Sequence, residues 1–385
     1  MTEHGEGRDA PGGFRETVTD TAISDWSDQS VVYRGYDVLD LVRESTFTEV
    51  AYLLLCGDLP EDLYLADFRA MLAESLDGEA WSDESAWMSD LLDRLPLNVP
   101  LTEILRTAIS AVAHFDPQPA DRSLEADRAR SIRLLGRVPM LVAARVAMIR
   151  GEERPSADPE RSFSSQLAVL LIGRVPSPLL ERALDVLLIS VIDVGFSPAV
   201  QAARLAAAAG ADVHGAVLAA AAVESTSERT GLAERLVELW AERPWGEDPD
   251  GWVLERLDAG LGVPGSVFGG QAVVDPRRET AVAWAEQLAS ESGSESTRDS
   301  DRAAAELEAA VVACGGVPGW DWSTIRLLAA GGVEPYLHLP LVAVARLLGW
   351  AAHALEQSGH PVVSVARPHY VGPQPREIPA RPVWE

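Results

Sequence analysis

Four short stretches of the sequence place charged side chains among apolar or rigid neighbours. An aspartate can act as a general base, and an arginine can hold a carboxylate through two parallel hydrogen bonds. Structural roles are open as well: a helix cap for the aspartate, a buried ion pair for one arginine and surface positions for the others. The stretches are residues 263–277, ending in Asp275-Pro276-Arg277, residues 320–323, with Asp321 between two tryptophans, residues 345–350, with Arg346 on an apolar helix, and residues 367–373, beginning with Arg367.

Motifs for several other chemistries are missing from the sequence. It contains no Walker loop, no dinucleotide-binding βαβ fingerprint, no HExxH and no Cys-x-x-Cys. Cys56 and Cys314 have no partner at zinc-ligand spacing and are interpreted as free thiols in a reducing compartment. The seven histidines are scattered without metal-ligand spacing. We therefore predict no metal site and no permanently bound cofactor.

The composition restricts the classes of partner. The chain has 385 residues, 59 acidic and 32 basic, giving a net charge of −27, and every basic residue is an arginine. Nucleic acids and anionic membranes need clustered cations, so neither is an expected partner, although a local arginine pocket for a small anion remains compatible with this charge. The acid excess without lysine resembles surfaces adapted to a salt-rich cytoplasm. With no secretory signal and no apolar run long enough to span a bilayer, a cytoplasmic location is expected.

Helical patterns dominate the elements that would position these charges. Thr46 begins a capping box before an apolar run, and residues 101–112 repeat apolar side chains at the helical period. Residues 183–192 are apolar nearly all round and indicate a buried helix. Ser197 before a proline predicts a helix start, and the alanine-rich run 201–223 is broken only at a glycine. The predicted fold class is all-α.

Strand and loop signals are few. Residues 20–23 and 31–33 predict a short hairpin near the N-terminus. The serine-rich and acidic stretch 290–301 predicts a solvated loop between helices. Nothing indicates alternating strands and helices, so a parallel sheet is not expected.

Taken in order, several phrases resemble the citrate synthase family over almost the full length of the chain. They are residues 20–24 (DTAIS), residues 33–37 (YRGYD), residues 45–55, residues 349–357 and residues 370–373 (YVGP). The resemblance implies a mostly helical homodimer, with a large domain and a smaller mobile one. It predicts residues 1–225 and 325–385 in the large domain and residues 226–324 in the small domain.

The resemblance also implies a reaction. In the family, a carboxylate removes a proton from the methyl group of acetyl-CoA while one histidine hydrogen-bonds the thioester oxygen. A second histidine polarises the ketone of a 2-oxo acid such as oxaloacetate, and arginines hold its carboxylates. Small dicarboxylates or 2-oxo acids are therefore the expected partners, with an acyl-CoA as co-substrate if the protein is active.

The acid and the arginines of the family carry over onto this sequence. The family phrase PNVDFYS matches residues 318–324 and places the catalytic aspartate at Asp321. The DPR phrase places a substrate-binding arginine at Arg277, and a second falls on Arg346. The arginine that the family donates across the dimer falls on Arg367.

The histidines of the family do not carry over. The phrase HAEHxLNAST matches residues 191–200, where Val191 and Val194 stand at the histidine positions. In GPLHGGA the position of the enol-stabilising histidine falls on Arg229, and in PGFGHRVY the ketone-polarising histidine falls on Phe268. Valine and phenylalanine exchange no protons, and a guanidinium is a permanent cation.

Three functional hypotheses follow from this pattern. The first is a family member with lost or weakened catalysis that still binds a dicarboxylate, as a homodimer or as a heterodimer with an active paralogue. The second is an active citrate or 2-methylcitrate synthase-type acyltransferase, or a citryl-CoA-lyase-like enzyme, with Asp321 as its base. The third is a purely structural protein without ligand binding.

Overall fold

The computed structural model describes residues 20–27, 30–78, 82–226, 229–269 and 275–359. The chain divides into two units, one formed by residues 1–19 and 362–385 and the other by residues 20–361. All described residues lie in the second unit. They form sixteen α-helices and five short strands, which confirms the predicted all-α class.

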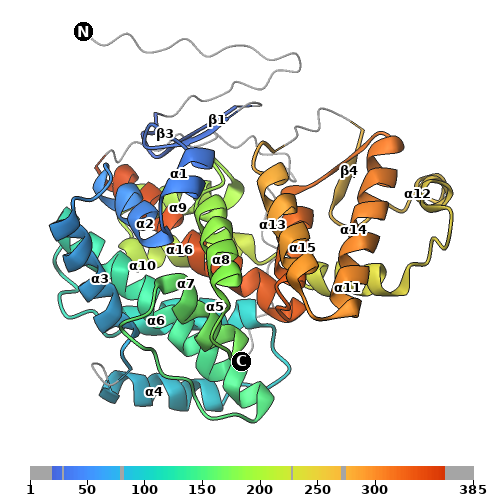
Figure 1. Cartoon of the computed structure of the whole chain (residues 1–385). Helices are drawn as coiled ribbons and strands as arrows, with labels where there is room; N and C mark the ends of the chain where they lie inside the picture. The colour runs from blue at the N-terminus through green and yellow to red at the C-terminus, as the bar shows by residue number, and fades with distance from the viewer. Residues whose placement is uncertain (1–19, 28–29, 79–81, 227–228, 270–274, 360–385) are drawn as a thin grey trace, which may run out of the picture. The chain divides into compact units, whose positions relative to one another are not determined.

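The first part of this unit contains three strands and ten helices. Their arrangement is shown in Figure 1. The strands are β1 (Ser24–Trp26), β2 (Val31–Tyr33) and β3 (Tyr36–Asp37). The helices are α1 (Val38–Glu44), α2 (Phe47–Cys56), α3 (Asp62–Leu76), α4 (Ser82–Asp93), α5 (Leu101–Ala113), α6 (Leu124–Arg150), α7 (Phe163–Leu167), which continues as a π-turn (Ala168–Ile172), α8 (Pro178–Val191), α9 (Pro198–Ala208) and α10 (Val213–Glu224).

The second part contains six helices and a two-stranded sheet. The helices are α11 (Leu232–Glu242), α12 (Pro249–Asp258), α13 (Arg278–Glu291), α14 (Glu295–Ala313), α15 (Trp320–Ala330) and α16 (His338–Ser358), the last preceded by a 3₁₀ turn (Pro335–Leu337). Antiparallel strands β4 (Ser266–Phe268) and β5 (Gly316–Pro318) pair with Val267 opposite Val317.

Local sequence signals account for several helix ends. The Thr46 side chain accepts from the backbone of Glu49, whose carboxylate accepts from the Thr46 backbone, so the predicted capping box begins α2. Gly57 ends that helix with φ of 101°, a left-handed conformation that suits glycine. Ser197 caps α9 through the backbone of Val200, also as predicted.

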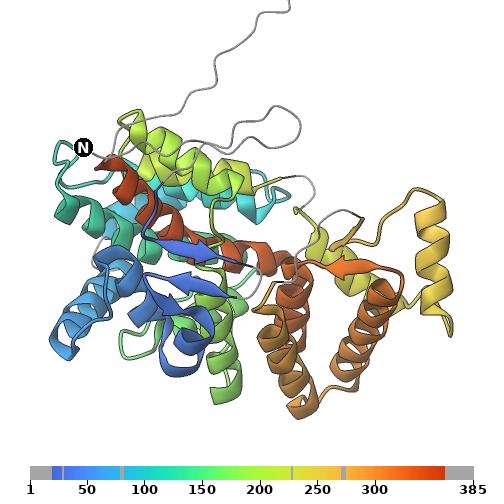
Figure 2. The same cartoon turned by 90° about the horizontal axis from the view of Figure 1, so that it is seen from above.

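The N-terminal hairpin is present, but its first strand lies later than predicted. β1 begins at Ser24 rather than occupying residues 20–23, and the short β3 adds a third strand to the sheet. The preceding residues bond to α16 instead: the Thr21 hydroxyl and the Ala22 amide both donate to the Glu356 carboxylate. Figure 2 shows the blue strands beside the red α16.

The predicted loop over residues 290–301 is wrong for most of its length. Helix α13 continues to Glu291, and α14 begins at Glu295, so only three residues connect them. The Ser294 hydroxyl accepts from the backbone of Thr297 at 3.2 Å and caps α14. Serine and acidic residues favour a helix start as much as a solvated loop, so the composition was ambiguous.

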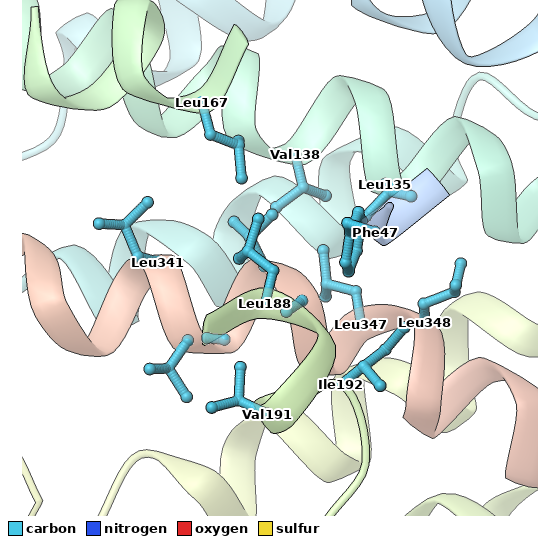
Figure 3. Packing of buried hydrophobic residues seen from close by; sticks show 14 of the residues in the cluster. Phe47, Leu135, Val138, Leu167, Leu188, Val191, Ile192, Leu341, Leu347 and Leu348 are labelled. Atoms are coloured by element: carbon cyan, nitrogen blue, oxygen red, sulfur yellow. The ribbon is translucent and has the colours of Figure 1, made fainter. Parts of the chain in front are cut away.

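The main hydrophobic core surrounds α16. Figure 3 shows Leu188, Val191 and Ile192, from α8 and its end, facing Leu341, Leu347 and Leu348 of α16. Gly349 permits this approach, because a Cβ there would lie 2.0 Å from the Ile192 carbonyl oxygen. The core therefore fixes α16, which carries Arg346, against the end of α8.

A second hydrophobic cluster is built from α11, α12, α14 and α15. At its centre, Trp240 and Trp322 meet edge to face with ring centroids 5.5 Å apart. Both indoles are buried. This cluster supports the start of α15, where Asp321 lies.

One segment, Pro335–Ser358, is long and apolar enough by length and composition to cross a membrane. Within the fold, 94% of its most apolar window is buried. It therefore has the character of a core helix, since its apolar surface is already covered by protein.

Candidate functional site

A cavity of about 530 Å³ brings together most of the charged residues that the sequence singled out. Asp321, Arg277, Arg346 and Arg229 all line it, although they come from distant parts of the chain. Arg367 lies outside the described residues. The remaining lining residues are Trp26, Val194, Ser197, Pro198, Ala199, Val223, Glu224, Thr226, Gly265, Val267, Asp275, Gly319 and Trp320.

Helix starts and tight turns position the acid. Gly319 is the N-cap of α15, and its amide donates to the Gly265 carbonyl at 2.8 Å, which ties the helix to the turn before β4. Asp321 lies in the first turn of α15, where the helix dipole favours a negative charge. Its side chain lines the cavity, where it accepts a hydrogen bond from Arg229.

The loop between α8 and α9 is held by a buried aspartate. Asp193 accepts hydrogen bonds from the Ser24 hydroxyl, from the Gly195 amide at 3.1 Å and from His353 Nε2 at 3.1 Å. Burial opposes the charge of Asp193, but these hydrogen bonds and the nearby His353 outweigh it and lower its pKa. This anchor fixes Val194 at the cavity wall.

Arg277 is fully enclosed by its own chain. Its Nε and Nη2 atoms donate to the two oxygens of Asp275 at 2.9 and 2.6 Å, and its Nη1 atom donates to the Ser190 carbonyl. The guanidinium lies 4.3 Å from the ring centroids of both Trp26 and Trp320. Burial alone would lower its pKa, but the Asp275 hydrogen bonds outweigh this and raise it.

Arg346 is buried on α16 and pairs with a residue that the sequence interpretation missed. Its Nη1 atom donates to Glu224 Oε1, and only 3% of Arg346 and 7% of Glu224 are exposed. Burial lowers the pKa of Arg346 to about 10, with Asp193 and Tyr33 opposing the shift, so it remains charged at neutral pH. The Nε atom of Arg346 is buried and makes no hydrogen bond to any described residue.

Arg229 connects two of the three acids that line the cavity, Glu224 and Asp321. It donates through Nη1 to Glu224 Oε1 and through Nη2 to Asp321 Oδ1, the second at 2.6 Å. Glu224 therefore accepts from two arginines on one oxygen. The available sequence signal was an acid ending the alanine-rich run that forms α10.

The positions at which the resemblance places the family's histidines differ in their surroundings. Val194 lines the cavity, whereas Val191 is fully buried and belongs to the main core (Figure 3). Phe268 lies on β4 and packs against the second hydrophobic cluster. None of the described residues lining the cavity is a histidine.

One histidine nevertheless lies near the acid. His338 lines a smaller cavity of about 30 Å³ together with Arg229 and Asp321. Its Nε2 atom lies 3.0 Å from the Val333 carbonyl, while Nδ1 is buried without a partner among the described residues. Burial lowers its pKa to about 4. Sequence spacing gave no sign of this proximity, which arises because the 3₁₀ turn just before His338 packs against α11 and α15.

No group of three or more metal-ligating side chains occurs within the described part of the chain. The charged groups of the cavity are instead arginines and carboxylates, which suits an organic anion better than a metal ion. The chemistry within reach is proton transfer at Asp321 and carboxylate or enolate binding by arginine.

Comparison with known proteins agrees with the fold. The citrate synthase structure from Pyrobaculum aerophilum superposes with a TM-score of 0.81 at 22% identity, covering 97% of both chains. A ternary complex of carboxymethyl coenzyme A and oxaloacetate with the citrate synthase of Thermoplasma acidophilum gives 0.82 at 20% identity, over 95% of this chain and 96% of that one. The predicted citrate-synthase-like architecture is thereby confirmed.

Sequence comparison places the chain in a family. The citrate/2-methylcitrate synthase of Bacillus subtilis strain 168 is 27% identical over 370 residues, covering 95% of this chain and 97% of that protein. The citrate synthase of Haloferax volcanii is 28% identical over 346 residues, covering 85% and 86%. The family described as "Citrate synthase, C-terminal domain" matches residues 13–369. The chain belongs to the citrate synthase family.

Proposed function

We propose that this protein binds a small dicarboxylate or 2-oxo acid in the 530 Å³ cavity and that its citrate-type condensing activity is lost or weakened. The observation that carries the proposal is the ion pair between Arg229 and Asp321 at 2.6 Å, in a cavity whose described lining contains no histidine. Family membership supports citrate-type condensation as the ancestral chemistry.

The ion pair works against the first step of condensation. To remove a proton from the methyl group of an acyl-CoA, Asp321 must direct a carboxylate oxygen at that carbon, and its contact with Arg229 through Oδ1 leaves only Oδ2 for this task. Arg229 cannot then return a proton, because a guanidinium stays charged at neutral pH. Each missing polarising donor removes about 3 kcal/mol of transition-state stabilisation. Two such losses slow the reaction by about four orders of magnitude.

An active enzyme is the second candidate, and one observation favours it. The side chains of Asp321 and Arg229 are 35% and 22% exposed and remain side by side at the cavity. A cation next to a base can stabilise an enolate oxygen in place of a histidine. In this case Asp321 acts as the base, with an acyl-CoA as co-substrate.

A CoA-release assay separates these two functions. Acetyl-CoA and propionyl-CoA are each offered with oxaloacetate to the wild-type protein and to Asp321→Asn. The proposal expects no turnover above background in either protein. Turnover by the wild type that disappears in Asp321→Asn, but persists in the exposed control Asp258→Asn, contradicts the proposal and establishes the active enzyme.

Ligand binding is tested separately by thermal shift at high salt. A 2-oxo acid, offered as pyruvate or as oxaloacetate, is expected to raise the melting temperature, and Arg346→Met is expected to abolish the rise. If pyruvate, oxaloacetate, citrate and CoA all leave the melting temperature unchanged, the binding role fails and a purely structural role replaces it.

Further parts of the proposal concern assembly. We infer that residues 226–324 form a smaller mobile domain, an assignment supported by the separate hydrophobic cluster between Ala233 and Ile325. We also infer a cytoplasmic homodimer, or a heterodimer with an active paralogue, in which Arg367 completes the partner's site. Light scattering of the purified protein, alone and co-expressed with a paralogue, distinguishes these assemblies from a monomer.

A further inference from the structure

Charged side chains of alternating sign cross the cavity in one continuous series. Arg346 of α16 contacts Glu224 at the end of α10, Glu224 contacts Arg229, and Arg229 contacts Asp321 of α15. Arg346 and Glu224 are 122 residues apart in the chain, and Arg229 and Asp321 are 92 residues apart. The arginines that could hold an external carboxylate are therefore already holding internal ones.

Among the described residues, the formal charges lining the cavity cancel. Arginine contributes three positive charges, from Arg229, Arg277 and Arg346, and the acids Glu224, Asp275 and Asp321 contribute three negative charges. A ligand with two negative charges would leave the cavity with an excess of two, in surroundings where burial strengthens repulsion. A ligand with one negative charge would leave an excess of only one negative charge.

Glu224 does not owe its position to its helix. It is the last residue of α10, where the helix dipole disfavours a carboxylate, and its side chain is 8% exposed. What stabilises it there is the pair of arginine contacts to Oε1. A neutral side chain would satisfy the helix better, so the carboxylate is explained by what it does to the two arginines.

The cavity residues also include donors without acceptors. Among the described residues, Arg346 Nε, Trp26 Nε1 and Trp320 Nε1 are buried and make no hydrogen bond. Buried donors are normally satisfied, so these favour a ligand that brings oxygen acceptors. A 2-oxo acid supplies a carbonyl oxygen for this purpose in addition to its carboxylate.

We propose that Glu224 is a specificity-determining residue, an internal carboxylate that occupies Arg346 and Arg229 and restricts the cavity to 2-oxo acids with a single carboxylate. This inference rests on the proposed binding function and narrows its ligand class. A dicarboxylate must displace Glu224 from both arginines, whereas a monocarboxylate needs only one new contact beside them.

The test is isothermal titration calorimetry with four probes that share the 2-oxo group. Pyruvate and 2-oxobutyrate carry one carboxylate, and oxaloacetate and 2-oxoglutarate carry two. The wild-type protein is expected to bind the monocarboxylates at least about tenfold more tightly. In Glu224→Gln, which keeps the shape but removes the charge, the preference is expected to reverse.

A matched control separates ligand charge from general destabilisation. Glu308 is likewise buried between two arginines, Arg278 and Arg326, but does not line the cavity. Glu308→Gln should therefore keep the wild-type preference. If it reverses the preference as well, the role of Glu224 is refuted.

The remaining outcomes are also decisive. Tighter binding of oxaloacetate than of pyruvate by the wild type overturns the inference but leaves the binding function intact, and this comparison needs no variant. If only Glu224→Gln binds a dicarboxylate, the inference holds in its strongest form. If neither protein binds any probe, the binding function itself fails, and the inference fails with it.

Discussion

The contribution of the Arg277 contacts to the free energy of unfolding can be measured by replacing this arginine with lysine. Arg277→Lys keeps the positive charge, so it tests the geometry of the guanidinium and not its charge. In the structure that geometry provides two hydrogen bonds to Asp275 and contact with the faces of Trp26 and Trp320, both at 4.3 Å. An ammonium group is a point charge and cannot keep all four contacts.

The expected loss follows from counting those contacts. A desolvated cation over an indole contributes about 2 kcal/mol, and lysine keeps at most one of the two indole faces. Loss of the second hydrogen bond to Asp275 removes about 1 kcal/mol more. We therefore expect Arg277→Lys to lower the free energy of unfolding by about 3 kcal/mol.

Urea unfolding followed by tryptophan fluorescence measures this loss, since the chain contains 11 tryptophans. Arg256→Lys is the matched control, because Arg256 lies over one indole instead of two, that of Trp252 at 4.9 Å, donates only to the Gly262 carbonyl and is partly exposed. That variant should lose less than about 1 kcal/mol. If Arg277→Lys loses no more than the control, the enclosure of Arg277 is refuted.

Three further perturbations test other features of the structure. Burial lowers the pKa of His338 to about 4, so the unfolded chain takes up a proton first as the pH falls below about 6.5. Stability should drop between there and pH 4, by about 2 kcal/mol at pH 5, and urea unfolding of His338→Phe should show a drop smaller by that amount. Gly349→Ala should lower the unfolding free energy by about 3 kcal/mol or more, because its Cβ would overlap the Ile192 carbonyl oxygen, whereas Gly262→Ala has open space and should be nearly neutral. The acid excess predicts a higher melting temperature in molar KCl than in dilute buffer, and an unchanged value would exclude adaptation to salt.

Local signals predicted much of the helical fold because they act over one or two turns. The capping box at Thr46 and the Ser197-Pro198 start each depend on neighbours within three residues, and both begin a helix. The first strand was misplaced because Thr21 and Ala22 bond to Glu356, more than 330 positions away. Such distant partners leave no mark on local periodicity.

The residues of the candidate site also divide into those that the sequence indicated and those that it did not. The family resemblance indicated Asp321, Arg277 and Arg346, and the structure brings all three to one cavity. The resemblance did not indicate Glu224, since this acid meets Arg346 only after α10 and α16 have packed together. The proximity of His338 to Asp321 likewise depends on the packing of α16 near α15.

The charge balance of the cavity changes what the acidic composition means. Because the three arginines and three acids of the described lining cancel, the other 56 acids and 29 arginines of the chain carry its net charge of −27. A negative surface repels dianions more strongly than monoanions during approach, and salt screens this repulsion. The negative surface and Glu224 therefore both favour monocarboxylates over dicarboxylates. In molar KCl, only the contribution of the surface to this preference should disappear. A preference for monocarboxylates that persists at high salt thus belongs to the cavity itself.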